Sequence, residues 1–188
     1  MGRPKLLMPW GEGCVIDQVL QAWCGSQVSK VTMTVRADDE PLLQRAAQHD
    51  IDVVAVDPPP VDMKASVQRA LEHIQGAYQP EVTAVWLLAP ADMPGLTSQL
   101  IDHVLHSHQE AEPSIIAPQV DARKGHPVLF PWSLAAAVDQ LASDVGIREL
   151  WNLHDGRTIC WQDDRPLEDM DTWDDYQRLQ SQQEDLNP

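Results

Sequence analysis

The feature that most constrains the fold is a regular alternation between short apolar runs and longer amphipathic segments. Runs of β-branched and apolar residues predict strands, and apolar residues at helical spacing predict helices. The predicted strands cover residues 28–36, 51–56, 82–88, 114–117, 128–130 and 158–161. The predicted helices cover residues 14–24, 41–49, 63–75, 97–108, 133–141, 145–153 and 172–182. This order predicts an α/β fold in which a mostly parallel sheet carries helices on both faces.

The chain length of 188 residues predicts a single domain spanning 1–188. A chain of this size can bury about 70% of its unfolded surface, so a sizeable core is expected. The alternation of strands and helices loosens from about residue 120 onward. We therefore expect residues 1–119 to form one half of the domain. Residues 120–188 are expected to form an added lobe over the carboxyl edge of the sheet, with a closing helix.

The net charge limits the partners of this protein. With 13 basic and 29 acidic residues, the formal charge is −16. Nucleic acids and anionic membranes need basic patches, so neither is an expected partner. The three cysteines, Cys14, Cys24 and Cys160, form no C-x-x-C pair, and no apolar stretch is long enough for a transmembrane helix. These features predict a cytoplasmic protein with small buried thiols.

One acidic residue lies where a ligand is expected. The apolar run from Val85 to Leu88 continues into Ala-Pro-Ala, Asp92 and a Met-Pro turn. Open α/β sheets bind ligands at the carboxyl ends of their strands. A carboxylate there suits a hard cation such as Mg²⁺, shared with the phosphates of a nucleotide. A simpler interpretation is also open, in which Asp92 only caps the following helix.

Several short motifs follow one another in an order that is known from one family. They lie at residues 1–9, 56–58, 63–67, 87–94, 125–130, 144–148 and 169–172. Together they resemble the MobA-like nucleotidyltransferases, most closely the molybdenum cofactor cytidylyltransferases. Gly-His-Pro-Val-Leu-Phe at 125–130 matches the family segment in full, whereas Asp57 and Asp62 replace the usual Asn and Gly. The resemblance implies a three-layer, Rossmann-like (GT-A-like) nucleotidyltransferase fold.

The resemblance also implies an activity. Family members transfer a nucleoside monophosphate from CTP or GTP to molybdopterin or molybdenum cofactor and release pyrophosphate. Residues 1–119 would then bind the nucleotide, and residues 120–188 would form the substrate side. Mg²⁺ is the expected cofactor, and a molybdoenzyme could receive the product.

The motifs assign roles to the nucleotide and metal site by resemblance. Lys5 would contact the triphosphate as a point charge. Asp92 would hold Mg²⁺, and Asp169 or Asp171 could complete the metal site. As for Asp92, a simpler interpretation remains open for each of these residues. Lys5 could be a solvated side chain, and Asp169 and Asp171 could be helix N-caps.

Other motif residues would bind the two substrates. Asp57 would lie near the base or ribose, and Ser66 belongs to a second motif on the nucleotide side. Gly125 and His126 would line the pterin side, where glycine allows the backbone to approach closely. His126 could also be an ordinary loop residue before Pro127.

The first half of the opening family signature does not occur in this sequence. In the family, that half is a central strand followed by a glycine-bearing turn whose amides hold the triphosphate. The resemblance therefore predicts a sheet that lacks its usual first central strand. The absence of such a strand would reduce the folding free energy by an amount on the order of 10 kcal/mol. We expect codons upstream of Met1 to encode the missing half. Two alternatives are a weak or inactive member that carries the cofactor, and a sheet that is rearranged or completed by a partner. A sugar-phosphate nucleotidyltransferase is a less favoured alternative.

Overall fold

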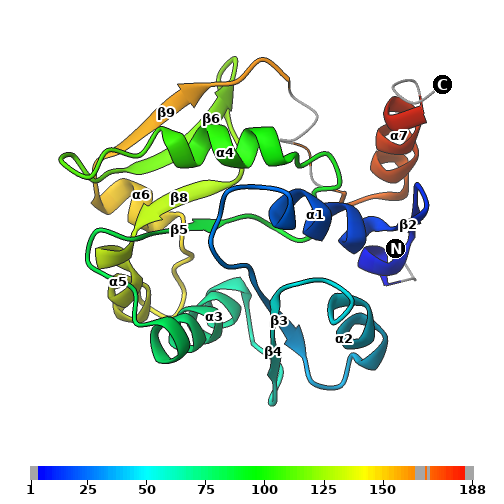
Figure 1. Cartoon of the computed structure of the whole chain (residues 1–188), viewed down its shortest axis with the longest axis horizontal. Helices are drawn as coiled ribbons and strands as arrows, with labels where there is room; N and C mark the ends of the chain where they lie inside the picture. Colours follow the sequence, from blue (N-terminus) through cyan, green and yellow to red (C-terminus); the bar gives the residue numbers. More distant parts are fainter. Residues whose placement is uncertain (1–3, 164–167, 169, 185–188) are drawn as a thin grey trace.

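A mixed sheet forms the centre of the larger part of the molecule (Figure 1). The computed structural model describes residues 4–163, 168 and 170–184. The main sheet has the order β5 (Val85–Leu88), β8 (Val128–Pro131), β6 (Ile115–Val120) and β7 (Arg123–Lys124). A fifth strand, β9 (Gly156–Cys160), pairs with β6 in parallel, whereas β5–β8, β8–β6 and β6–β7 are antiparallel pairs.

A second, smaller sheet lies beside the first. It consists of β3 (Thr32–Arg36) and β4 (Asp52–Val56), which pair in parallel. A short hairpin of β1 (Pro9–Trp10) and β2 (Gly13–Cys14) precedes the first helix. Within the described residues, no strand connects β3 to β5. The expectation that a central strand is lacking is therefore confirmed for this part of the chain.

The helices cover both faces of the sheets (Figure 1). One face carries α1 (Val15–Cys24), α2 (Glu40–Ala46) and α4 (Ser98–His106). The other carries α3 (Met63–Tyr78), α5 (Ala135–Gln140) and α6 (Glu149–Leu153). The last helix, α7 (Trp173–Glu184), packs with the β1–β2 hairpin, and two 3₁₀ turns lie at η1 (Lys5–Leu7) and η2 (Trp132–Leu134).

Strand β5 shows why the fold has three layers. Val85 and Leu87 pack against the apolar cluster beneath α1 and α4, and Trp86 and Leu88 pack with the cluster beneath α3 and α5. Successive side chains of a strand point to opposite faces, so an apolar run such as this one is covered on both sides. Trp86 stacks on Phe130 of the neighbouring strand, with 4.3 Å between the ring centroids.

The predicted α/β fold class is confirmed, but the sheet is mixed rather than mostly parallel. Seven residues separate the end of β6 from the start of β8, and they contain β7 rather than a helix. A parallel return needs a crossover of about a dozen residues, so β8 runs antiparallel. Element boundaries also shift: the predicted strand 28–36 begins only at Thr32, and the predicted helix 145–153 begins at Glu149.

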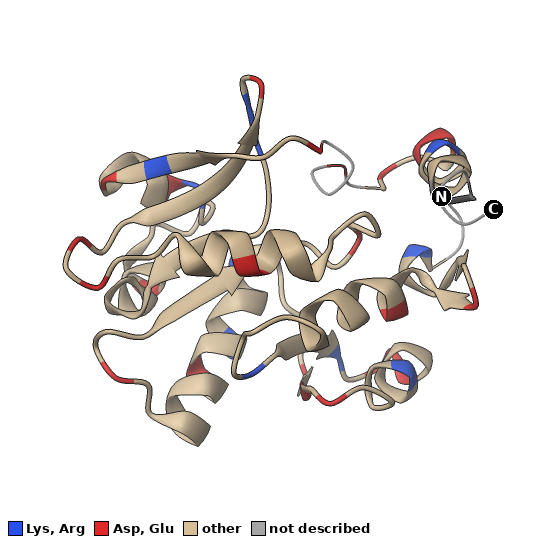
Figure 2. Ribbon diagram, turned by 45° about the horizontal axis from the view of Figure 1, so that its top comes forward, with Lys and Arg blue, Asp and Glu red and all other residues tan. Residues whose placement is uncertain are grey.

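Two expectations about the surface can be compared with the structure. Only Cys14 is buried; Cys24 and Cys160 are exposed because they lie at the end of α1 and on the edge strand β9, so the prediction of buried thiols is wrong for them. Asp and Glu are spread over helices and loops on several sides (Figure 2). In the part of the chain that the structure describes, no helix is long and apolar enough to cross a membrane.

Candidate functional site

Asp92 lies just beyond the carboxyl end of β5, on a well-anchored turn. Its backbone carbonyl accepts a hydrogen bond from Met170 N at 3.0 Å, and the next residue, Met93, is fully buried. The Asp92 side chain retains 15% of its exposed area. Helix α4 is capped by Thr97, which accepts from Leu100 N at 3.3 Å. Asp92 is therefore not the cap of the following helix.

Lys5 lies between two carboxylates. Its ammonium donates a short hydrogen bond to Asp92 Oδ2 and a second one, of 3.1 Å, to Asp171 Oδ1. Burial lowers the pKa of Lys5, but the hydrogen bonds to Asp92 and Asp171 outweigh this effect and the pKa is raised. Lys5 is therefore a partly buried cation held by acidic groups, and not merely a solvated side chain.

Asp171 comes to this cluster from the opposite end of the chain. The first turn of α7 is closed by Thr172, which accepts from Asp175 N at 3.1 Å and donates its own N–H to Asp175 Oδ2 at 2.9 Å. The described hydrogen bond to the Asp171 side chain comes instead from Lys5. The sequence alternative that Asp171 is a helix cap therefore loses its support. Asp169 lies outside the described residues.

The chemistry of this cluster suits a cation. Mg²⁺ is commonly held by one or two carboxylates together with substrate phosphates and water. Asp92 and Asp171 provide two carboxylates around one positive charge, so these residues fit a divalent ion. Among the described residues, no group of three or more His, Cys, Asp or Glu side chains could hold a metal. Oxygen atoms of a bound substrate or of solvent would have to complete the coordination.

The predicted pterin-side residues lie at the same strand end. His126 Nδ1 is 3.3 Å from the carbonyl oxygen of Leu88, the last residue of β5. Gly125 is buried, and its N–H donates to Pro118 O at 2.9 Å. The loop that precedes β8 therefore brings Gly125 and His126 to the edge from which Asp92 emerges.

Asp57 and Ser66 belong to the smaller sheet and its covering helix. Asp57 is exposed directly after β4, and Ser66 lies in the first turns of α3. The Ser66 carbonyl accepts from Thr34 Oγ1 at 3.0 Å, which fixes α3 on β3. No described hydrogen bond or ion pair connects Asp57 or Ser66 to Lys5. The structure thus assembles part of the predicted site and leaves these two residues across a gap in the sheet.

Two buried charged side chains were not singled out by the sequence. Lys64 donates to the carbonyl of Ala142 at 2.6 Å and so connects the start of α3 to the loop after α5. Asp17 lies in the first turn of α1 and contacts Arg45 and His49. In the sequence, each is an isolated charged residue within an amphipathic helix, a pattern typical of a solvent-facing position. The sequence therefore does not predict that they are buried.

The fold and this site together define a class: an α/β protein of nucleotidyltransferase fold, with an acid and a lysine at the carboxyl end of β5. The family follows from the sequence. The chain belongs to the MobA-like NTP transferase family, because the family model for the MobA-like NTP transferase domain matches residues 1–158. A nucleoside triphosphate is the substrate class that this membership implies.

Solved structures agree with this fold. Rv0371c from Mycobacterium tuberculosis H37Rv is 25% identical, with a TM-score of 0.81 over 96% of this chain and 91% of that one. A complex of Rv0371c with manganese is 22% identical, with a TM-score of 0.74 over 96% and 93%. Molybdopterin-guanine dinucleotide biosynthesis protein A from Archaeoglobus fulgidus is 15% identical, with a TM-score of 0.73 over 98% and 92%. No curated protein matches the sequence.

Proposed function

We propose that this protein transfers a nucleoside monophosphate from CTP or GTP to molybdopterin or molybdenum cofactor and releases pyrophosphate. The observation that carries the proposal is the cluster of Lys5, Asp92 and Asp171 at the carboxyl end of β5. The choice of acceptor is supported by the complete Gly-His-Pro-Val-Leu-Phe motif, whose Gly125 and His126 lie at the same edge. A similar fold in a molybdopterin-guanine dinucleotide biosynthesis protein is consistent with this choice.

The reaction needs positioning and charge neutralisation more than covalent help from the protein. An oxygen of the terminal phosphate of the pterin attacks the α-phosphorus of the nucleotide. A new P–O bond forms, and the bond to the bridging oxygen of the β-phosphate breaks, so that pyrophosphate leaves with the electron pair. The Lys5 ammonium exchanges a carboxylate oxygen for triphosphate oxygens and stabilises the negative charge there.

Asp92 and Asp171 are the described residues that would hold Mg²⁺, with Asp169 as a further candidate ligand from the sequence. When bound, Mg²⁺ supplies further neutralisation of the phosphate charge. Asp57 and Ser66 serve the nucleoside side in this proposal. Gly125 and His126, with the rest of residues 120–188, serve the acceptor side.

Nucleotide binding tests the proposal directly. Calorimetric titration of Mg-CTP and Mg-GTP should give binding to the wild-type chain that weakens at least about tenfold in Asp92→Ala, equivalent to about 1.4 kcal/mol. Asp38→Ala is the matched control, because Asp38 is an exposed acid paired with Arg36. Titration of Mn²⁺ by paramagnetic resonance should show weaker metal binding in Asp92→Ala only. Equal binding by wild type and Asp92→Ala would refute the assigned site.

A second function is favoured by the break between β3 and β5. A sheet with this gap offers fewer backbone groups to a triphosphate at its strand ends, so the protein could carry the cofactor without catalysis. In that case the chain binds molybdopterin but gives no pyrophosphate release with CTP or GTP. Normal release of pyrophosphate would eliminate this carrier function, and release with a sugar phosphate as acceptor would point to the less favoured sugar-phosphate reaction.

A further inference from the structure

Two carboxylates and one ammonium share the carboxyl end of β5, and the backbone of the two acidic residues is firmly held. Met170 N donates to the carbonyl oxygen of Asp92 at 3.0 Å. Asp171 follows Met170 directly in the chain, and the Met170 side chain is fully buried. One backbone hydrogen bond and one buried side chain therefore hold Asp92 and Asp171 beside each other.

Lys5 is the member of this cluster that can move. Its ammonium is carried by a long flexible stem, and 35% of the Lys5 side chain is exposed. A rotation of this side chain leaves the backbone of Asp92 and Asp171 in place, because the hydrogen bond from Met170 N does not involve Lys5. The cluster is thus a fixed pair of oxygen ligands with a movable cation between them.

Lys5 and a divalent cation need the same oxygen atoms. The Lys5 ammonium donates a short hydrogen bond to Asp92 Oδ2 and a second one, of 3.1 Å, to Asp171 Oδ1. Mg²⁺ held by these carboxylates would lie about 2.1 Å from its oxygen ligands. The ammonium is charged at neutral pH, and two positive charges within about 4 Å of each other repel strongly. Lys5 therefore has to leave the carboxylates before a metal ion binds both of them.

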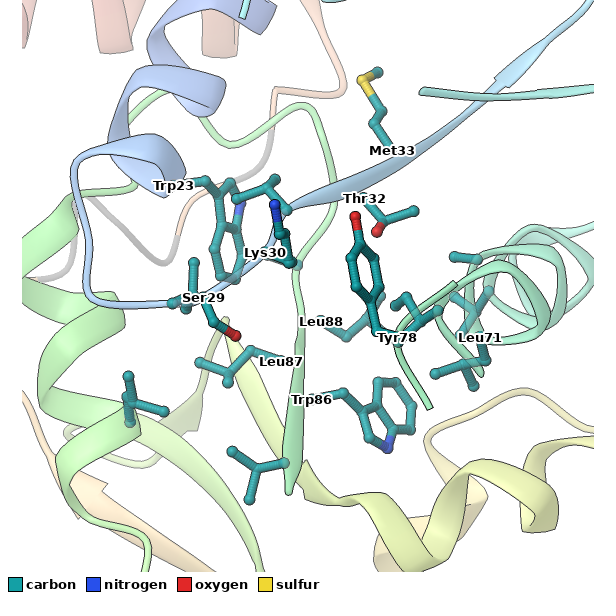
Figure 3. A pocket seen from close by; sticks show the side chains of 18 of the residues that line it. Trp23, Ser29, Lys30, Thr32, Met33, Leu71, Tyr78, Trp86, Leu87 and Leu88 are labelled. Carbon is teal, nitrogen blue, oxygen red and sulfur yellow. The ribbon is translucent and has the colours of Figure 1, made fainter. Parts of the chain in front are cut away.

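The surroundings of the cluster indicate where the Lys5 ammonium would find another anion. A cavity of about 710 Å³ lies between the two sheets (Figure 3), and its wall along β5 ends at Ala91, directly before Asp92. Of the described residues that line this cavity, only Lys30 is charged, so the cavity does not suit a triphosphate. A triphosphate bound at the carboxyl end of β5 would therefore stay outside the cavity, beside Lys5, and it carries more negative charge than the two carboxylates.

We propose that Lys5 is an internal competitor of the metal ion, which pairs with Asp92 and Asp171 until the phosphates of a nucleotide bind its ammonium instead. The protein then binds a divalent cation weakly by itself and more tightly together with a nucleoside triphosphate. The coupling is reciprocal, since the metal tightens nucleotide binding by the same factor. This inference rests on the proposed function, because it assigns a regulation to the same Asp92 site.

Removal of Lys5 should change the binding of metal and nucleotide in opposite directions. In Lys5→Met, titration of Mn²⁺ without nucleotide, followed by paramagnetic resonance, should give binding at least about tenfold tighter than in the wild type, because the competing charge is absent. Binding of Mg-CTP should weaken in the same variant, because the contact to the triphosphate is lost. Lys5→Arg retains a competing cation and should not gain affinity for Mn²⁺. Lys124→Met is the matched control for net charge, since the Lys124 ammonium lies over the ring of Trp151, and its affinity for Mn²⁺ should equal that of the wild type.

Chemical labelling of the wild-type chain gives a second measurement that needs no variant. Mn²⁺ at a concentration that saturates the protein should raise the rate of reductive methylation of Lys5 several-fold, as measured by mass spectrometry, because the ammonium is released from its carboxylates. Lys30 and Lys124, which lie over the rings of Tyr78 and Trp151, are the internal references and should keep their rates.

The outcomes distinguish this inference from the proposed function. Equal or weaker Mn²⁺ binding in Lys5→Met, or a methylation rate of Lys5 that Mn²⁺ does not change, would overturn the competition alone if Asp92→Ala still loses affinity for Mn²⁺ and nucleotide. A gain in Lys124→Met as large as that in Lys5→Met would assign the effect to net charge and would also overturn it. If Asp92→Ala binds both ligands as the wild type does, the assigned site and the competition fail together.

Discussion

The buried Asp17 cluster gives the sharpest prediction about stability. The Asp17 side chain is 7% exposed and lies at the start of α1, where it accepts from Cys14 N at 2.7 Å. It also accepts from Arg45 Nε at 2.7 Å, and it lies 3.0 Å from His49 Nε2. The Asp17 carboxylate therefore closes the first turn of α1. It also connects α1 to Arg45 in α2 and to His49, which follows α2.

Asp17→Asn should cost about 3 kcal/mol of folding free energy. Removing one partner of a buried ion pair typically costs about 3–5 kcal/mol, because the other charge loses its compensation. We expect the lower end of this energy range for Asp17→Asn, because 35% of the Arg45 side chain is exposed and its charge stays partly hydrated. An amide keeps the shape of the carboxylate and can still accept from Cys14 N. The loss therefore reflects the charge, and it corresponds to a fall in Tm of about 6–12 °C for a chain of this size.

Urea unfolding at pH 7, followed by tryptophan fluorescence, measures this loss. Asp38→Asn is the matched control, because the Arg36–Asp38 pair is more than half exposed on both sides and such pairs contribute about 0–1 kcal/mol. A loss below about 1 kcal/mol in Asp17→Asn, or an equal loss in the two variants, would show that the cluster is not a major source of stability.

Three further predictions follow from the same structure. Hydrogen bonds from Arg45, Cys14 and His49 outweigh the effect of burial and hold the pKa of Asp17 well below its usual range. The contribution of Asp17 to the folding free energy is therefore complete above the unfolded pKa of about 3.9 and declines as the pH falls below that value. The difference in stability between wild type and Asp17→Asn should narrow between pH 5 and pH 2 in urea titrations, and a constant difference would contradict the assignment. Gly13→Ala should destabilise by about 1–3 kcal/mol, because the added Cβ would lie 2.5 Å from Asp17 Oδ2, whereas Gly76→Ala, which has open space around it, should not destabilise when both are compared by thermal unfolding. Lys5→Met should weaken calorimetric binding of Mg-CTP or Mg-GTP at least about tenfold, whereas Lys124→Met, which removes a lysine that lies over the ring of Trp151, should leave it unchanged.

The sequence predicted the elements better than their pairing. Helix α1 and strand β4 are specified by local patterns, and both were predicted within one residue of their observed bounds. The direction of β8 depends on the connection from β6, which has to be read from loop length and not from the apolar pattern of Val128–Pro131. Pairing is a non-local property, so a motif that is correct in its residues can still be placed wrongly in the sheet.

The site residues, too, were only partly predictable from local sequence patterns. Lys5 and Asp92 could be singled out from the order of motifs, and the structure joins them directly. Their contact with Asp171, from the far end of the chain, depends on α7 folding back against the β1–β2 hairpin. Tyr176 fixes that return by donating to Pro9 O at 2.7 Å. No local pattern around Tyr176 predicts this hydrogen bond, because its acceptor is a backbone atom at the other end of the sequence.

The two sheets keep their places although no described strand joins them, and the helices explain why. Ile16 and Leu20 of α1 belong to one buried cluster with Leu100 of α4, and the Asp17–Arg45 pair connects α1 to α2 beside β3. On the opposite side, α3 contacts both β3 and α5. The packing of these helices therefore fixes the position of the smaller sheet beside the larger one.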